Sequence, residues 1–207
     1  MNILITPLYL PHIKNYLNRP IERRGNQLWC PISDAPMSTE FAISRFAVPH
    51  IQREGWALFM DSDIVCLADI NELFDLADDR FAVMVVKHGQ KHEDGIKMDG
   101  QMQTVYARKN WSSVMLFQCD HPANRRLTAD ALNTWPGRDL HAFKWLDDDL
   151  IGSLPKEWNH LVDVDPLAEM SQAKILHYTL GCPALPGWEP KPTDGPWNTA
   201  RMHCPFY

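Results

Sequence analysis

Two carboxylates separated by one residue follow directly on an apolar run, Trp56–Met60. An apolar run bounded by Gly55 predicts a buried strand, and acids at its end would lie at the rim of a sheet, where open α/β folds bind ligands. Side chains two residues apart on an extended backbone point the same way, so Asp61 and Asp63 can face one ion. Two acids at such a rim are costly without a positive partner, so the pattern indicates a divalent metal. On spacing alone, a solvated turn or a helix cap is the alternative.

His177 ends a second apolar run, Lys174–Leu176, and Gly181 follows closely. A neutral imidazole nitrogen at this strand end could supply a third metal ligand. Oxygen-rich ligation with one imidazole and open positions favours Mn²⁺ or Mg²⁺ over Zn²⁺, and such a metal commonly holds a diphosphate. A hydrogen-bonded core histidine is the alternative interpretation.

Asp147, Asp148 and Asp149 form a second acidic group between apolar pairs. We expect at least one of them to point toward the interior or a cleft, because large apolar residues flank them on both sides. The alternative is a helix start, where carboxylates complement the helix dipole.

Arg45 lies among apolar residues ahead of the strand that carries the first acids. Its guanidinium could contact phosphate or sugar oxygens. An ion pair with Glu40 or Asp61 is the alternative.

Strands alternating with helices would position these side chains and predict a single α/β domain. The predicted strands are Ile3–Ile5, Trp56–Met60, Phe81–Val86 (buried on both faces), Ser113–Phe117 and Ile175–Tyr178. The predicted helices are Ser38–Ala47 (ended by Pro49 and Gly55), Asp69–Leu76, Asn124–Leu132, and one that starts at or spans Trp145–Ile151. We expect irregular structure over Pro20–Pro36, a polar loop over Lys87–Gln103, and a surface tail beyond Gly181.

Composition excludes several classes of protein. The 207 residues carry a formal net charge of −6 with no Lys/Arg block, which argues against a nucleic-acid partner. No apolar run approaches the roughly 20 residues of a transmembrane helix, and no secretory signal is recognisable. Five widely spaced cysteines without a C-x-x-C pair predict neither a zinc site nor a disulfide framework, and favour a cytoplasmic setting.

The ordered set of motifs resembles glycosyltransferase family 8, the glycogenin and bacterial galactosyltransferase type, and looks most like a bacterial branch of it. The resemblance covers roughly residues 1–190, which we take as a glycosyltransferase-like domain, with 191–207 as a Pro-rich C-terminal tail. The matching segments are Ser38–Phe41 through Arg45-Phe46, Gly55–Asp63 with its D-x-D motif, Lys109–Ser113, Trp145–Asp148, Leu154-Pro155 with Trp158-Asn159, and His177–Thr179.

The resemblance implies a GT-A fold: a Rossmann-like α/β nucleotide-diphospho-sugar transferase with a mixed sheet flanked by helices. The family's first β-α unit would be missing ahead of Asn2. The resemblance further implies transfer with retention of configuration to an unknown acceptor: a glycan, a lipid-linked sugar or a protein. The roles that it implies are metal ligation of Mn²⁺ (or Mg²⁺) by Asp61, Asp63 and His177, donor binding by Arg45, Ser113 and Gly181, and catalysis by Asp147 and Asp148.

Two other classes of function compete with this one. A nucleotide-sugar-binding protein without turnover is suggested by the missing unit. A metal-dependent phosphohydrolase could also use acids and a histidine. A two-metal hydrolase would need further His and Asp residues at sheet ends, whereas the other histidines fall mostly in loops.

Overall fold

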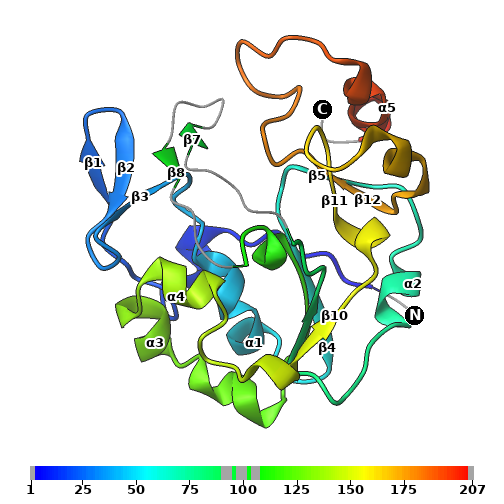
Figure 1. The fold of residues 1–207 in the computed structure, drawn as a ribbon. Coiled ribbons are helices and arrows are strands. Elements are labelled where there is room, and N and C mark those ends of the chain that lie inside the picture. The colour runs from blue at the N-terminus through cyan, green and yellow to red at the C-terminus, as the bar shows by residue number, and fades with distance from the viewer. Residues whose placement is uncertain (1–2, 90–94, 97–101, 104–107, 205–207) are drawn as a thin grey trace.

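A mixed four-stranded sheet forms the centre of the molecule (Figure 1). The computed structural model describes residues 3–89, 95–96, 102–103 and 108–204. The strand order is β10 (Ile151–Ser153), β6 (Val83–Val85), β9 (Val114–Gln118) and β4 (Trp56–Met60). β10 and β6 are parallel, whereas β9 runs antiparallel to both β6 and β4. The predicted class, α/β with a mixed sheet flanked by helices, is confirmed.

Three of the central strands, β4, β6 and β9, contribute alternate side chains to two apolar clusters on opposite faces of the sheet. In β4, Ala57 and Phe59 pack against one cluster, and Trp56, Leu58 and Met60 pack against the other. The same alternation holds in β6 and β9. A sheet covered on both faces requires near-continuous apolar strands, which is why these runs could be recognised in the sequence.

Short helices cover the two faces. The first cluster includes buried residues of η1 (Leu10–Ile13), η2 (Ser44–Ala47), α3 (Ala129–Thr134) and α4 (Gly137–His141). The second includes buried residues of α2 (Asn71–Phe74) and η6 (Lys156–Asn159). Figure 1 shows α3 and α4 across the sheet from α2. No helix within the described ranges is long and apolar enough to cross a bilayer.

Three smaller sheets surround the central one. β11 (His160–Leu161), β12 (Ile175–His177) and β5 (Ile64–Cys66) form a mixed sheet beside the end of β4. β1 (Glu22–Arg24), β2 (Gln27–Cys30) and β3 (Ala35–Met37) form an antiparallel meander, and β7 (Gly95–Ile96) pairs with β8 (Met102–Gln103). The remaining helices are α1 (Val48–Ile51), η3 (Trp111–Ser113), η4 (Pro122–Arg126), η5 (Asp148–Leu150), η7 (Leu167–Gln172), η8 (Pro192–Asp194) and α5 (Gly195–Met202).

Two predictions for the first 36 residues are wrong. Ile3–Ile5 is not a strand, and Leu4 and Ile5 are exposed there without a pairing partner. Pro20–Pro36 contains β1, β2 and the start of β3 rather than irregular structure. These short strands were not recognised because their sequence is charged and contains proline. Only Leu28, Cys30 and Met37 are buried in them, so the sequence has no clear apolar pattern.

Two of the predicted helices are shorter or broken. Instead of one helix over Ser38–Ala47, turns lead into η2 and α1, and Pro49 lies in the first turn of α1 rather than ending the helix. The segment predicted as the helix Asn124–Leu132 is divided between η4 and α3, with Thr128 capping α3 through its hydroxyl.

Two corrections concern the second half of the chain. Trp145–Ile151 does not form an α-helix: η5 makes a single turn and β10 begins at Ile151. The residues beyond Gly181 include α5, and Trp197 in this helix packs edge-on against the buried Tyr178. Part of the predicted polar loop over Lys87–Gln103 lies outside the described residues.

Candidate metal site

Strand register brings the predicted ligands together. Asp61 follows β4 directly, and its backbone N–H donates to the Ser113 carbonyl oxygen at 2.9 Å. In the neighbouring sheet, β5 pairs with β12 so that Ile64 lies opposite His177. The Tyr178 N–H then donates to the Asp63 carbonyl oxygen at 2.9 Å. These backbone hydrogen bonds place the two acids and the histidine at the junction of the two sheets.

The three side chains converge on one point. One candidate ligand atom from each of Asp61, Asp63 and His177 lies within 4.8 Å of the other two. His177 is buried, and both acids are half-buried. Two carboxylates and one imidazole at this spacing fit a hard divalent ion such as Mn²⁺ or Mg²⁺.

The orientation of the His177 ring follows from Asn159, which is fully buried. Asn159 Nδ2 donates to the Asn110 carbonyl oxygen (3.3 Å) and to Ser113 Oγ (2.9 Å), so its Oδ1 faces His177 Nδ1 at 3.2 Å. That contact requires a proton on Nδ1, which leaves Nε2 to face Asp63 Oδ1 at 3.4 Å. A divalent ion could join these two atoms, as could a proton on Nε2. A histidine whose second nitrogen donates to a fixed oxygen is also the usual form of a metal ligand.

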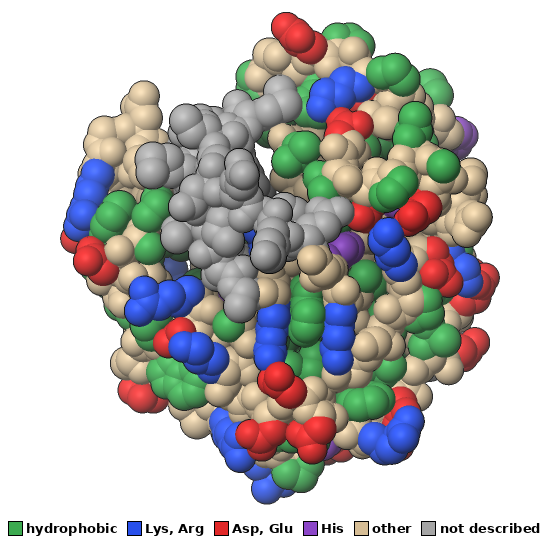
Figure 2. Space-filling model, in the orientation of Figure 1, with side chains coloured by type: hydrophobic (Ala, Val, Ile, Leu, Met, Phe, Trp, Pro, Cys, Tyr) green, Lys and Arg blue, Asp and Glu red, His purple; other side chains and the backbone are tan. Residues whose placement is uncertain are grey.

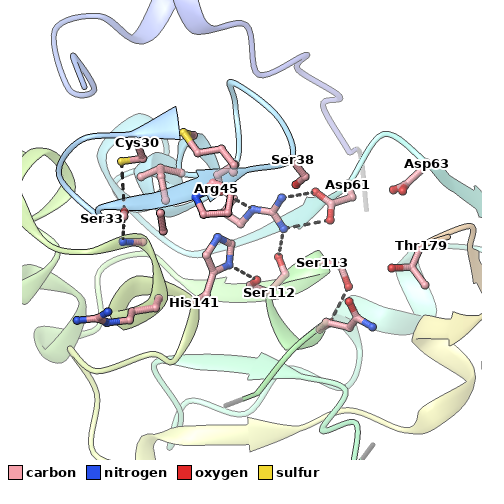
Figure 3. Close-up of a pocket in the computed structure, with 18 of the residues that line it drawn as sticks. Cys30, Ser33, Ser38, Arg45, Asp61, Asp63, Ser112, Ser113, His141 and Thr179 are labelled. Atoms are coloured by element: carbon pink, nitrogen blue, oxygen red, sulfur yellow. Dashed lines mark hydrogen bonds and ion pairs between the residues drawn. The ribbon is translucent and has the colours of Figure 1, made fainter. Parts of the chain in front are cut away.

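Arg45 neutralises one of the two acids directly. Its Nη2 lies 2.7 Å from Asp61 Oδ1 and its Nη1 lies 3.0 Å from Asp61 Oδ2, which makes a bidentate pair. The Ser112 and Ala42 carbonyl oxygens accept the other hydrogen bonds of the guanidinium. Arg45 is therefore held in the wall against Asp61, as the ion-pair alternative predicted (Figure 3).

His141 is a half-buried histidine beside this pair. Its Nδ1 lies 2.8 Å from Ser112 Oγ, and its ring stands edge-on to Phe46. Burial lowers the pKa of His141 well below its usual value, and the positive charge of Arg45 lowers it further. This imidazole is therefore neutral at pH 7.

The site opens into a cavity of about 190 Å³. Figure 3 shows Asp61, Asp63 and Thr179 at one end of it and Cys30 and Ser33 at the other. The wall at the Cys30 end comes from β2, β3 and the start of α4, so the meander that was predicted to be irregular forms part of one end of the cavity.

Ser113 and Gly181, both predicted to bind the donor, are placed differently. Ser113 lines the cavity and is 2% exposed, with its hydroxyl engaged by Asn110 and Asn159. Gly181 is not part of the wall formed by the described residues. It follows β12 with a φ of 128°, a backbone conformation that glycine accommodates readily.

The second acidic group does not reach the cavity. Asp147, Asp148 and Asp149 are all exposed, so the prediction that at least one points inward is wrong. Asp148 pairs with Arg108, and Asp147 lies 3.7 Å from Arg126. Figure 2 shows acidic and basic side chains side by side on the lower part of the visible face. The short η5 turn carries these acids outward while Trp145 and Leu146 fill the core.

Two residues of the site, Asn159 and His141, were not assigned roles from the sequence. Asn159 belongs to a matching segment, but nothing in the spacing links it to His177, because parallel pairing of β11 with β12 brings them together. His141 carries no motif, and its place becomes visible only in the packed structure.

Comparison with known proteins gives one relative and several partial structural likenesses. No protein-family model matches the chain. Protein CDI of Arabidopsis thaliana is 48% identical over 176 residues, which are 82% of this chain and 62% of that protein. The chain thus spans less than two thirds of this relative, whose name states no activity.

The structural likenesses are to glycosyltransferases. The WbbM bifunctional glycosyltransferase is 17% identical, with a TM-score of 0.47 over 71% of this chain and 32% of that one. GlyE of Streptococcus pneumoniae TIGR4 is 17% identical, with a TM-score of 0.44 over 65% and 36%. Mouse xyloside xylosyltransferase 1 is 14% identical, with a TM-score of 0.42 over 67% and 64%.

Proposed function

We propose that this protein is a metal-dependent glycosyltransferase that binds a nucleotide-diphospho-sugar through an ion held by Asp61, Asp63 and His177. The observation that carries the proposal is the convergence of these three side chains at the end of a cavity, with His177 Nε2 facing Asp63. The ordered motifs of the sequence support the same conclusion. Mn²⁺ is the expected ion, with Mg²⁺ as the alternative.

The residues around the proposed diphosphate site have different roles. The ion, when bound, would act as a Lewis acid toward the charge that develops on the leaving diphosphate. Asn159 keeps His177 in the ligating tautomer, and Arg45 keeps Asp61 in position. Because an anionic donor must enter a protein with a net charge of −6, a bound cation would also offset the charge of Asp63, while Arg45 already pairs with Asp61.

Catalysis at the sugar is the less supported half of the proposal. Asp147 and Asp148 were predicted to act there, but they are exposed and paired with arginines. Retention of the anomeric configuration, a cytoplasmic setting and transfer to a glycan, lipid-linked sugar or protein acceptor follow from the sequence resemblance and composition alone. All five cysteines are free, which agrees with a reducing compartment.

The placement of Asp147 and Asp148 favours a second candidate function, a nucleotide-sugar-binding protein without turnover. Such a protein needs the metal ligands and the cavity but no group beside the anomeric carbon. A phosphohydrolase has less support, since the described residues contain one such group of three ligands.

The two candidates are separated by assaying the purified protein with Mn²⁺ and common UDP- and GDP-sugars. A transferase should release nucleoside diphosphate, by transfer or by slow donor hydrolysis, and should lose this activity in EDTA and in Asp63→Ala. Saturable Mn²⁺-dependent donor binding without release would establish the binding protein. Absence of both binding and release would refute the two proposals together, whereas release of nucleoside monophosphate and sugar 1-phosphate would indicate the hydrolase.

A further inference from the structure

Asn110 lies in the cavity wall with its backbone carbonyl group engaged. It is 8% exposed and immediately precedes η3. Its carbonyl oxygen accepts from Ser113 Oγ at 2.7 Å and from Asn159 Nδ2 at 3.3 Å. Asn159 also forms a hydrogen bond with His177, so Asn110 is connected to a candidate metal ligand through the side chain of Asn159.

The side-chain amide of Asn110, by contrast, has a donor group without a partner. Its Nδ2 is buried and makes no hydrogen bond with the protein, and of the residues that line the cavity it is the only one within the described ranges with such an atom. A buried donor left unsatisfied is costly, because it has lost its hydrogen bonds to water without replacement. An acceptor that enters the cavity would remove this cost, so the amide is prepared for a ligand oxygen.

The backbone of Asn110 determines which substitution can test the amide. Its φ of 65° is left-handed, a conformation that asparagine tolerates better than most residues and that glycine adopts readily. Glycine would satisfy the backbone at position 110, whereas only the asparagine adds an N–H donor to the cavity.

We propose that Asn110 Nδ2 donates a hydrogen bond to an oxygen of the bound donor, either a phosphate oxygen or a sugar hydroxyl, beside the metal. This inference deepens the proposed function and depends on it. Asn110 would thereby add recognition of the ligand to a site in which Asn159 and Arg45 only position other side chains.

The test compares Asn110→Gly with the wild-type protein. Glycine preserves the left-handed backbone and removes the amide, so the melting temperature should stay the same or rise. Dissociation constants are measured by calorimetry with Mn²⁺ present, for UDP and UDP-glucose and for GDP and GDP-mannose. We expect roughly 10-fold weaker binding in Asn110→Gly. Equal loss for the diphosphates and their sugars assigns the contact to phosphate, and loss for the sugars alone assigns it to a hydroxyl.

Two further variants keep the test decisive. Asp34→Gly replaces an exposed residue that also has a positive φ (45°) and should bind like the wild type. Asn110→Asp keeps the shape of the side chain but replaces the donor with a negative acceptor, and should bind more weakly than Asn110→Gly. Binding by Asn110→Gly within twofold of the wild type for every probe would overturn the inference while leaving the proposed function intact. If the wild type binds none of the probes, the proposed function fails and the inference fails with it.

Discussion

The protein contains two acidic groups that follow apolar residues, and they have opposite fates. Asp61 and Asp63 follow β4, are half-buried and converge with His177. Asp147–Asp149 follow Trp145 and Leu146 and are exposed on a short turn. The first group is fixed by the backbone hydrogen bonds of two sheets, whereas the second is held by arginines at the surface.

The difference shows what makes an acidic pair a site. Apolar neighbours alone do not carry a carboxylate inward, because a single tight turn can direct it to solvent. Burial of a carboxylate also requires a cationic partner from another segment of the chain. Asp61 has this partner in Arg45, whose side chain is 9% exposed. The arginine partner of Asp148 faces an acid that is 84% exposed.

The largest expected difference between the two acidic groups is in the free energy of unfolding after a carboxylate is removed. We expect Asp61→Ala to lower the free energy of unfolding by about 3 kcal/mol, because it leaves the buried Arg45 charge without a partner. Asp148→Ala should cost less than about 1 kcal/mol, because its ion pair is solvated. Urea unfolding in EDTA measures both. Equal costs would contradict the contrast between a built site and a surface cluster.

The hydrogen bond from His177 to Asn159 can be tested by comparing two substitutions at position 159, one that removes the acceptor and one that keeps it. Asn159→Leu removes the acceptor of the Nδ1 proton and should weaken Mn²⁺ binding about 10- to 100-fold. Asn159→Asp keeps an acceptor there and should retain most of the affinity. The control is Asn124→Leu, which removes another buried asparagine, hydrogen-bonded to Ala82, Gln118 and Trp145. It should lower the melting temperature without changing Mn²⁺ affinity; equal Mn²⁺ affinity in Asn159→Leu and Asn159→Asp would contradict the tautomer assignment.

A fall in pH should lower the free energy of unfolding through His141. Its pKa is lowered by burial and by Arg45, so below pH about 6.5 the unfolded chain takes up a proton that the folded protein does not. The stability it contributes is therefore present above that pH and is lost as the pH falls, by about 1 kcal/mol between pH 6.5 and 5.5. Unfolding curves of His141→Gln should show a shallower loss than the wild type, whereas His12→Gln, at an exposed position, should not. An unchanged slope in His141→Gln would contradict a histidine that stays neutral in the folded protein.

The sequence predicted the elements that are regular and the ligands that they carry. The apolar runs of β4, β6, β9 and β12 were recognisable because each strand buries both faces or packs in a core. The candidate ligands Asp61, Asp63 and His177 lie beside strand ends, so the sequence pattern and their positions were enough to predict that they could converge.

What could not be predicted depends on contacts between distant segments. The meander β1–β3 has few buried residues, and its role in the cavity wall appears only when it meets α4. Asn159 reaches His177 through the parallel pairing of two-residue and three-residue strands. At Asp148 the chain forms the short turn η5 instead of an α-helix, and the flanking apolar residues are compatible with either structure.

Calorimetric titration of the purified protein with Mn²⁺ tests the central claim most directly. We predict one bound ion per chain in the wild type and a loss of more than about 100-fold in affinity in both Asp63→Ala and His177→Ala. Asp147→Ala and Asp148→Ala should bind the ion like the wild type. Unchanged affinity in the first two variants, or an equal loss in the last two, would contradict the assignment of the metal site to the junction of β4, β5 and β12.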